Sequence, residues 1–317
     1  MASHASKRVL YAALIGNSLI AVTKFSAAAV TGSSAMLSEA IHSVVDTLNQ
    51  VLLLYGLRRS ARAADEEHPF GYGRELYFWS FVVAILIFAV GAGVSIYEGI
   101  DRVMHPHAVS SPTINYVVLG LAMVFESGAL YIAVKEFNTL RGSTRWITAV
   151  RHSKNPAVFT VLFEDTAALL GLLIAFIGLV LAQYLDLPWL DGAASIGIGV
   201  LLAFTAMFLA YETKALLIGE AASDVLRIGI QEIVAKAHSI RTINELRTMH
   251  MGPEDVLLAL SLDFHDHLNA GQVEESIFIL EMAIKSRFPE ITRLFIEVQS
   301  QSRHDEVAAA DANRRTP

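Results

Sequence analysis

Two short stretches of the chain carry side chains that could hold a metal ion in an apolar setting. His42 and Asp46 stand four residues apart, and Asn49 follows three residues later. On a helix these positions share one face, so an imidazole and a carboxylate lie about one turn apart. They make half of a tetrahedral site for a divalent ion such as zinc, to which Asn49 could add an amide oxygen or a hydrogen bond. A second acidic pair, Glu164 and Asp165, lies in another apolar segment.

Ionisable residues in an apolar, membrane-spanning segment need a partner or access to water. A carboxylate at the centre of a bilayer costs about 2.5–3.5 kcal/mol, so Asp46 requires a partner or a water-filled path. One alternative is a helix-packing pair, with His42 neutral and Asp46 hydrogen-bonded to Ser43 or to a neighbouring span. The acidic pair at 164–165 favours a shared cation instead, because carboxylates that are brought together without one repel each other.

The composition indicates a membrane protein. The 317 residues are 54% hydrophobic and 17% charged, with a mean hydropathy of +0.47, which is too apolar for an average soluble domain. The net charge of -7 gives no indication of nucleic-acid binding, and the first residues lack the pattern of a cleaved secretory signal. The absence of cysteine excludes disulfides and thiolate metal sites.

Six apolar segments have the length of about 20 residues that a membrane span requires. They cover residues 9–30, 35–57, 77–100, 114–134, 157–183 and 193–213. Lysines and arginines gather on alternate connections: before the first span, over 58–74 and over 135–154, while the opposite connections hold only Arg102. By the positive-inside rule, both termini are expected to be cytoplasmic, or on the matrix side if the membrane is mitochondrial.

A small cytoplasmic domain of α+β type is expected after the last span. Its predicted order is helix, strand, strand, helix, strand (αββαβ), over 223–238, 245–251, 256–264, 273–288 and 293–298. The predicted domains are therefore a six-helix transmembrane domain (1–218), the α+β domain (219–300) and a disordered tail (301–317).

Other polar residues within the spans are candidates for pairing or for conduction. Lys24 of the first span would pair most simply with a carboxylate. Glu39 shares the face of His42, nearer the non-cytoplasmic end, and is a candidate for gating or ion release. Glu126 of the fourth span is a candidate proton relay or an interhelical partner. Beyond the spans, the run His265, Asp266, His267 could bind an ion or be a solvated turn.

The order and spacing of several motifs resemble the cation diffusion facilitator family of divalent-metal transporters. These are His42 and Asp46 in SEAIHSVVDTLNQ, DEEHPFGYG with Asp65, His68, Phe70 and Gly71, Asp165 in the fifth span, and DGAAS from Asp191. The resemblance covers nearly the whole chain, and six spans followed by a small α+β domain is also the family layout.

The resemblance implies a transport site made of His42, Asp46 and Asp165. Val161 stands where the family places its fourth ligand, so Glu164 or water could complete the shell, as in a branch with Glu-Asp on the fifth span. Glu164 is about 100° round the helix from Asp165 and could face the same cavity only if the helix is rotated or irregular.

Two further metal sites of the family have incomplete counterparts here. Asp65 and His68 remain as possible ligands, but Tyr72 stands where many relatives have His, and a solvated turn is the alternative. In the α+β domain the corresponding positions are Asn244, Ala259, Glu297 and Gln299, a poor set for zinc, so that domain could dimerise without metal.

The function that the resemblance implies is Zn²⁺/H⁺ antiport by a homodimer in a bilayer, with zinc as substrate and no permanently bound cofactor. The expected location is a bacterial inner membrane. Cobalt, nickel, manganese or iron are alternative ions, although the imidazole favours zinc over manganese. A non-transporting sensor or scaffold is the alternative function. An enzyme is not expected, because the sequence has no G-x-S-x-G, HExxH, P-loop or dinucleotide motif.

Overall fold

The computed structural model describes residues 2–315 except 108, 110, 142–145 and 147–155. Arg145, Arg151 and Lys154 of the predicted basic connection therefore lie outside the described residues. The chain divides into two compact units, one made of 1–64 with 75–214 and the other of 65–74 with 215–317. The sequence does not predict that residues 65–74, between two spans, belong with the C-terminal unit.

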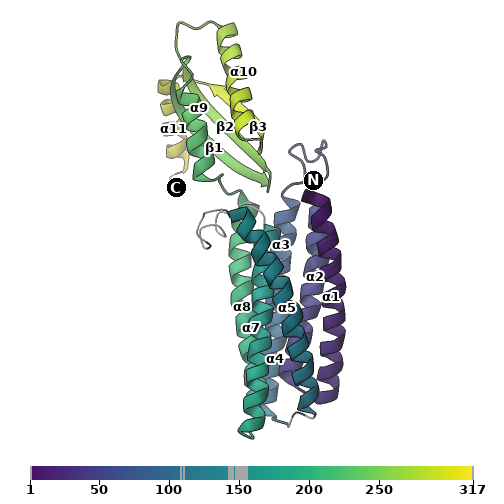
Figure 1. Cartoon of the computed structure of the whole chain (residues 1–317). Coiled ribbons are helices and arrows are strands. Elements are labelled where there is room, and N and C mark those ends of the chain that lie inside the picture. The colour runs from purple at the N-terminus through teal and green to yellow at the C-terminus, as the bar shows by residue number, and fades with distance from the viewer. Residues whose placement is uncertain (1, 108, 110, 142–145, 147–155, 316–317) are drawn as a thin grey trace. The chain divides into compact units, whose positions relative to one another are not determined.

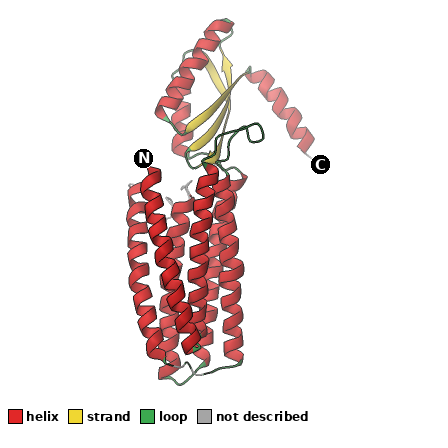
Figure 2. Cartoon of the chain, turned by 90° about the vertical axis from the view of Figure 1, so that its right-hand side faces the viewer, coloured by secondary structure: helices red, strands yellow, loops and turns green. Residues whose placement is uncertain are grey.

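The first unit is a bundle of long helices that lie side by side (Figures 1 and 2). In chain order they are α1 (Ala2–Thr31), α2 (Ser34–Ser60), α3 (Glu75–Leu86) continued by the π-helical turn η1 (Ile87–Ala92) and α4 (Gly93–Met104), α5 (Pro112–Arg141), α7 (Pro156–Tyr184) and α8 (Trp189–Ile218). Each matches one of the six predicted apolar segments in position.

Within the described residues, four of these spans are long and apolar enough to cross a membrane. The qualifying stretches are Glu75–Met104, Thr113–Lys135, Phe159–Tyr184 and Trp189–Ile218. The prediction of spans is confirmed for these four and stays a prediction for α1 and α2. In α2 the cause is visible, because a row of buried polar side chains interrupts its apolar surface.

Small residues let α4 and α8 approach each other closely. A methyl group built on Gly99 would lie 2.7 Å from the carbonyl oxygen of Gly192, and one on Gly192 would lie 2.8 Å from that of Gly99. Only glycine allows two backbones to pack at this separation. The glycines at the start of α8 therefore serve helix packing and fix α8 against the third span.

The second unit is a three-stranded sheet with two helices on one face. Its elements are α9 (Asp224–Ala235), β1 (Ile240–Gly252), β2 (Asp255–Phe264), α10 (Ala270–Arg287) and β3 (Ile291–Val298), which confirms the order αββαβ. The strands lie in the order β1-β2-β3, antiparallel in the first pair and parallel in the second. Alternate β2 residues from Val256 to Leu262 form one core with apolar residues of both helices, so both cover the same face.

The expectation of a disordered tail after residue 300 is wrong. Residues Gln301–Arg315 form the helix α11. At its start the Asp263 carboxylate accepts a hydrogen bond from the backbone N–H of Gln301 at 3.2 Å, and an acceptor at a helix N terminus is stabilising. The alanines at 308–310 add high helix propensity.

Candidate functional site

One face of α2 carries a continuous row of buried polar side chains. We call it the α2 polar row; its members are Glu39, His42, Asp46, Asn49 and Gln50. Within the described residues each of them has at least one buried nitrogen or oxygen without a hydrogen-bond partner, including both ring nitrogens of His42. His42 Nδ1 lies 3.5 Å from Asp46 Oδ1, consistent with their spacing on one helix face. Unpaired polar atoms are expensive to bury, so a row of them indicates a missing ligand or water.

The row faces α7. The amide of Asn49 donates a hydrogen bond to Glu164 Oε1 at 2.7 Å. Nearer the start of α2, a methyl group built on Gly171 would overlap Glu39 Oε1. The contact at Asn49 involves residue 164 of α7, whereas the contact at Glu39, earlier in α2, involves residue 171, so the two helices are antiparallel. His42 and Asp46 lie between these two contacts along the interface.

Charged groups from three other helices converge on Asp46. Glu164 and Asp165 of α7, Glu126 of α5 and Lys24 of α1 all lie within electrostatic reach of its carboxylate. The structure therefore brings the sequence-predicted residues of the second and fifth spans to one region, together with Glu126. A region with several carboxylates and one fixed cation is suited to attract a further positive charge.

The predicted ligands do not form a closed metal cage. Among the residues that the structure describes, no three His, Asp or Glu side chains are close enough together to hold one ion. Glu164 is occupied by Asn49, while Asp165, the next residue, points about 100° away and is half-buried. The ligand set of His42, Asp46 and Asp165 with Glu164 stays a prediction, and binding would require these side chains to draw together.

Lys24 pairs with Glu39. Its ammonium Nζ lies 3.0 Å from Glu39 Oε2 and 2.9 Å from Ser43 Oγ, and all three side chains are buried. The expectation that Lys24 pairs with a carboxylate is thereby met, and the pair joins α1 to α2 beside His42. Ser43 is a hydrogen-bond partner of Lys24, whereas the helix-packing alternative assigned it to Asp46.

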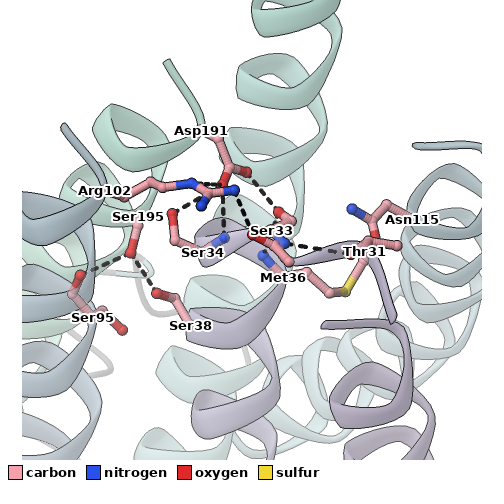
Figure 3. A network of polar contacts seen from close by, with 11 residues as sticks. Thr31, Ser33, Ser34, Met36, Ser38, Ser95, Arg102, Asn115, Asp191 and Ser195 are labelled. Atoms are coloured by element: carbon pink, nitrogen blue, oxygen red, sulfur yellow. Dashed lines mark hydrogen bonds and ion pairs between the residues drawn. The ribbon is translucent and has the colours of Figure 1, made fainter. Parts of the chain in front are cut away.

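A second polar cluster fastens the start of α2 to α8 (Figure 3). The fully buried Asp191 carboxylate accepts hydrogen bonds from Ser33 Oγ at 2.6 Å, from the Ser34 backbone N–H at 2.7 Å and from Ser34 Oγ at 3.0 Å. Arg102 Nε lies 3.7 Å from the same carboxylate, and Arg102 also donates to the Gly32 carbonyl at 2.5 Å. The negative charge stands at the N terminus of α2, where the helix dipole favours it.

Serines extend this cluster to the third span. Ser38 Oγ and Ser195 Oγ lie 2.5 Å apart, and Ser195 Oγ donates to the Ser95 carbonyl at 2.8 Å (Figure 3). From the sequence, Asp191 is noted only as the first residue of the motif DGAAS. Its role as a clamp was missed, although the serine pair at the start of α2 was a usable signal for an N-terminal cap.

The 65–74 loop is a hydrogen-bonded turn of the second unit. Asp65 Oδ1 accepts from the His68 backbone N–H and Oδ2 accepts from the Tyr72 hydroxyl, each at 2.7 Å. The Arg293 guanidinium lies 5.7 Å from the centre of the Phe70 ring, and Arg74 donates to Met249 Sδ at 2.8 Å. These contacts favour a structural turn, in which Tyr72 fills the place of a metal on Asp65.

The remaining candidates of the second unit are engaged by neighbouring groups. Asn244 donates to the Gln299 carbonyl at 2.7 Å. In the exposed turn after β2, Arg241 lies 2.6 Å from Asp266, and this hydrogen bond holds the pKa of the Asp266 carboxyl below its usual value. An aspartate that is already paired with an arginine is a poor ligand, which favours the solvated turn over an ion site.

Residues 10–218 match the family described as the cation efflux transmembrane domain. The chain belongs to the cation diffusion facilitator family. Relatives in this family carry the names of an antiporter and an efflux pump, which are transporters and not enzymes, and the converging carboxylates of this membrane domain suit a cation transporter.

Relatives with curated names include the mitochondrial proton-coupled zinc antiporter SLC30A9 of Homo sapiens, 33% identical over 81% of this chain and 46% of that protein. The chain spans about half the length of these mitochondrial relatives. The cation-efflux pump FieF of Cronobacter sakazakii is 28% identical over 89% of both chains. Among solved structures, the nickel form of a MamM CTD variant has 15% identity and a TM-score of 0.23, covering 25% of this chain and 98% of that one.

The Asp191 clamp predicts a large loss of stability on substitution. Asp191→Asn loses a charged acceptor for three donors and leaves Arg102 without its carboxylate, which costs about 1–3 kcal/mol for each buried group left unsatisfied. The melting temperature in detergent is expected to fall by at least about 2–4 °C. Asp186→Asn, at an exposed aspartate before the same helix, is the matched control. Equal melting of the two variants would contradict the clamp.

The 65–74 turn predicts that one substitution creates a metal site. The rings of His68 and Tyr72 already lie 4.3 Å apart between centroids, and Tyr72 touches Asp65. Tyr72→His is therefore expected to raise the number of zinc ions bound per protomer by one, measured by equilibrium dialysis with metal analysis. Tyr72→Phe, which removes the hydroxyl without adding a ligand, is expected to leave the number unchanged.

Proposed function

We propose that this chain exports Zn²⁺ from the cytoplasm in exchange for protons, with His42, Asp46 and Asp165 as ligands and Glu164 as a fourth candidate. The observation that carries the proposal is the α2 polar row, in which every member has at least one buried nitrogen or oxygen without a partner among the described residues, and which faces the acidic side of α7. Family membership and the name of the antiporter SLC30A9 support the ion and the proton coupling.

The proposed mechanism is alternating access around this region. A divalent ion binds only to deprotonated ligands, so metal and protons compete for His42 and the carboxylates. Binding in a cytoplasm-facing state releases protons, and protons from the other side displace the ion after the helices have rocked. Since the cage is open among the described residues, ion binding itself would draw α2 and α7 together.

Each surrounding group has a place in this proposal. Asn49 holds Glu164 while the site is empty and would release it to the ion. Glu126, buried on α5 and within electrostatic reach of Asp46, is the candidate proton relay in this proposal. The proposal also includes six spans, cytoplasmic termini, a bacterial inner membrane and a homodimer, for which the basic connections and the family layout are the support.

Transport should depend on the two aspartates. Substituting a residue that hydrogen-bonds to a metal ligand lowers metal affinity about 10–100-fold, so the loss of a ligand itself is expected to lower affinity at least as much. Asp46→Ala and Asp165→Ala are expected to reduce pH-driven zinc flux in proteoliposomes at least about tenfold. Asp101→Ala and Glu254→Ala, in exposed positions, are the controls. Wild-type flux in either site variant would overturn the ligand assignment, and zinc binding without flux in the wild type would favour a sensor.

The imidazole should set ion preference. His42→Asp makes the set all-oxygen, which suits manganese better and zinc less well. The ratio of zinc to manganese flux is expected to fall by about tenfold or more, equivalent to about 1.4 kcal/mol of discrimination. An unchanged ratio would show that His42 does not contact the ion.

A further inference from the structure

The Lys24–Glu39 pair is only half satisfied. Glu39 Oε2 is bound by the Lys24 ammonium, but Oε1 is buried without a hydrogen-bond partner in the part of the chain that the structure describes. A pair that served packing alone would gain stability from a donor to the second oxygen, because a bare buried carboxylate oxygen costs about 1–3 kcal/mol or more. The free oxygen therefore points to a ligand that comes and goes.

Glu39 lies on the same face of α2 as the residues of the proposed transport site. Glu39 is three residues before His42 on the same face of α2, so the two side chains are about 5–6 Å apart at their Cβ atoms. Oε1 lies against Gly171 of α7, where any side chain would overlap it. Because Gly171 has no side chain, Glu39 Oε1 can pack against α7, on the same α2–α7 interface that holds Asn49 and Glu164.

Lys24 sets the charge at this point. Its ammonium is fully buried, bound to Glu39 and Ser43, and close enough to influence Asp46. A buried lysine is costly in a membrane and is retained where its charge has a use. Held by two partners, the ammonium stands beside any dication that reaches Glu39 and repels it.

Resting on the proposed function, we propose that Glu39 is a second, transient binding point for the transported dication, an exit site, and that Lys24 is its resident counter-ion. The ion passes from His42 and Asp46 to Glu39 Oε1. The nearby ammonium keeps the ion from settling there, and the Lys24–Glu39 pair re-forms fully when the ion leaves. Under the proposed orientation the start of α2 is the non-cytoplasmic end, so this is the release step.

Variants that change the charge of Lys24 or Glu39 distinguish an exit site from a pair that only stabilises helix packing. Lys24→Gln leaves Glu39 without its counter-ion, so zinc is expected to bind more tightly and to leave more slowly, with flux lowered about tenfold. Glu39→Gln removes the exit site and lowers flux by a similar factor. The neutral double variant Lys24→Gln with Glu39→Gln keeps hydrogen-bonding groups at both positions and should recover the wild-type melting temperature while its flux stays low.

A neutral variant tests the same point without altering charge. Gly171→Ala places a methyl group against Glu39 Oε1 and is expected to lower zinc flux in proteoliposomes. Gly128→Ala, at a helical glycine where an added methyl group would meet no atom of another element within 4 Å, is the matched control and should transport like the wild type.

The outcomes distinguish this proposal from the one on which it rests. If the double variant and Gly171→Ala both transport at the wild-type rate, Glu39 is not an exit site and the pair is structural. If the wild type itself moves no divalent ion, the proposed function fails instead. If Asp46→Ala abolishes flux while the Glu39 variants do not, only the exit site is lost.

Discussion

The cost of burying charge away from water governs this structure. A carboxylate in an apolar bundle must be neutralised, hydrogen-bonded or supplied with a cation. The first unit buries Glu39, Asp46, Glu126, Glu164 and Asp191, against one fully buried lysine, Lys24, among the described residues. The contacts of Lys24 with Glu39, of Asn49 with Glu164 and of Ser33, Ser34 and Arg102 with Asp191 offset part of that imbalance, and the proposed ion would offset more of it.

The two buried acidic regions answer the constraint in opposite ways. Asp191 is saturated, with three hydrogen bonds at 2.6–3.0 Å and an arginine beside it, so it has nothing left to offer a ligand. The α2 polar row has a single donor from Lys24 at one end and Asn49 bridging to Glu164 at the other, with unpaired atoms between. Both regions involve α2. A saturated cluster fixes the start of that helix, and the unsaturated row along its length stays available for exchange.

Features that follow from helix periodicity or from the cost of an isolated charge can be predicted from the sequence, whereas contacts between residues far apart in the chain cannot. The shared face of His42 and Asp46 follows from helix geometry, and the pairing of Lys24 with a carboxylate follows from the cost of an isolated charge. The Asp191 clamp joins residues 158 positions apart, and the 65–74 turn packs with residues such as Met249 and Arg293. No local pattern specifies such partners. The tail was misjudged because its polar composition concealed a helix that begins at the Asp263 carboxylate.

The difference between α2 and the four strongly apolar spans has a physical meaning. A helix that only has to sit in lipid can be apolar throughout, and the four qualifying stretches keep a mean hydropathy of 2.0–2.3 although α5, α7 and α8 each bury a carboxylate. A helix that must carry an ion past its surface needs polar atoms at intervals of three or four residues, and those atoms lower its hydropathy. Because the α2 row is buried against α7 and α1 rather than turned to lipid, the bundle can accept it. The buried polar row that lowers the hydropathy of α2 is therefore also the feature on which the proposed ion transport depends.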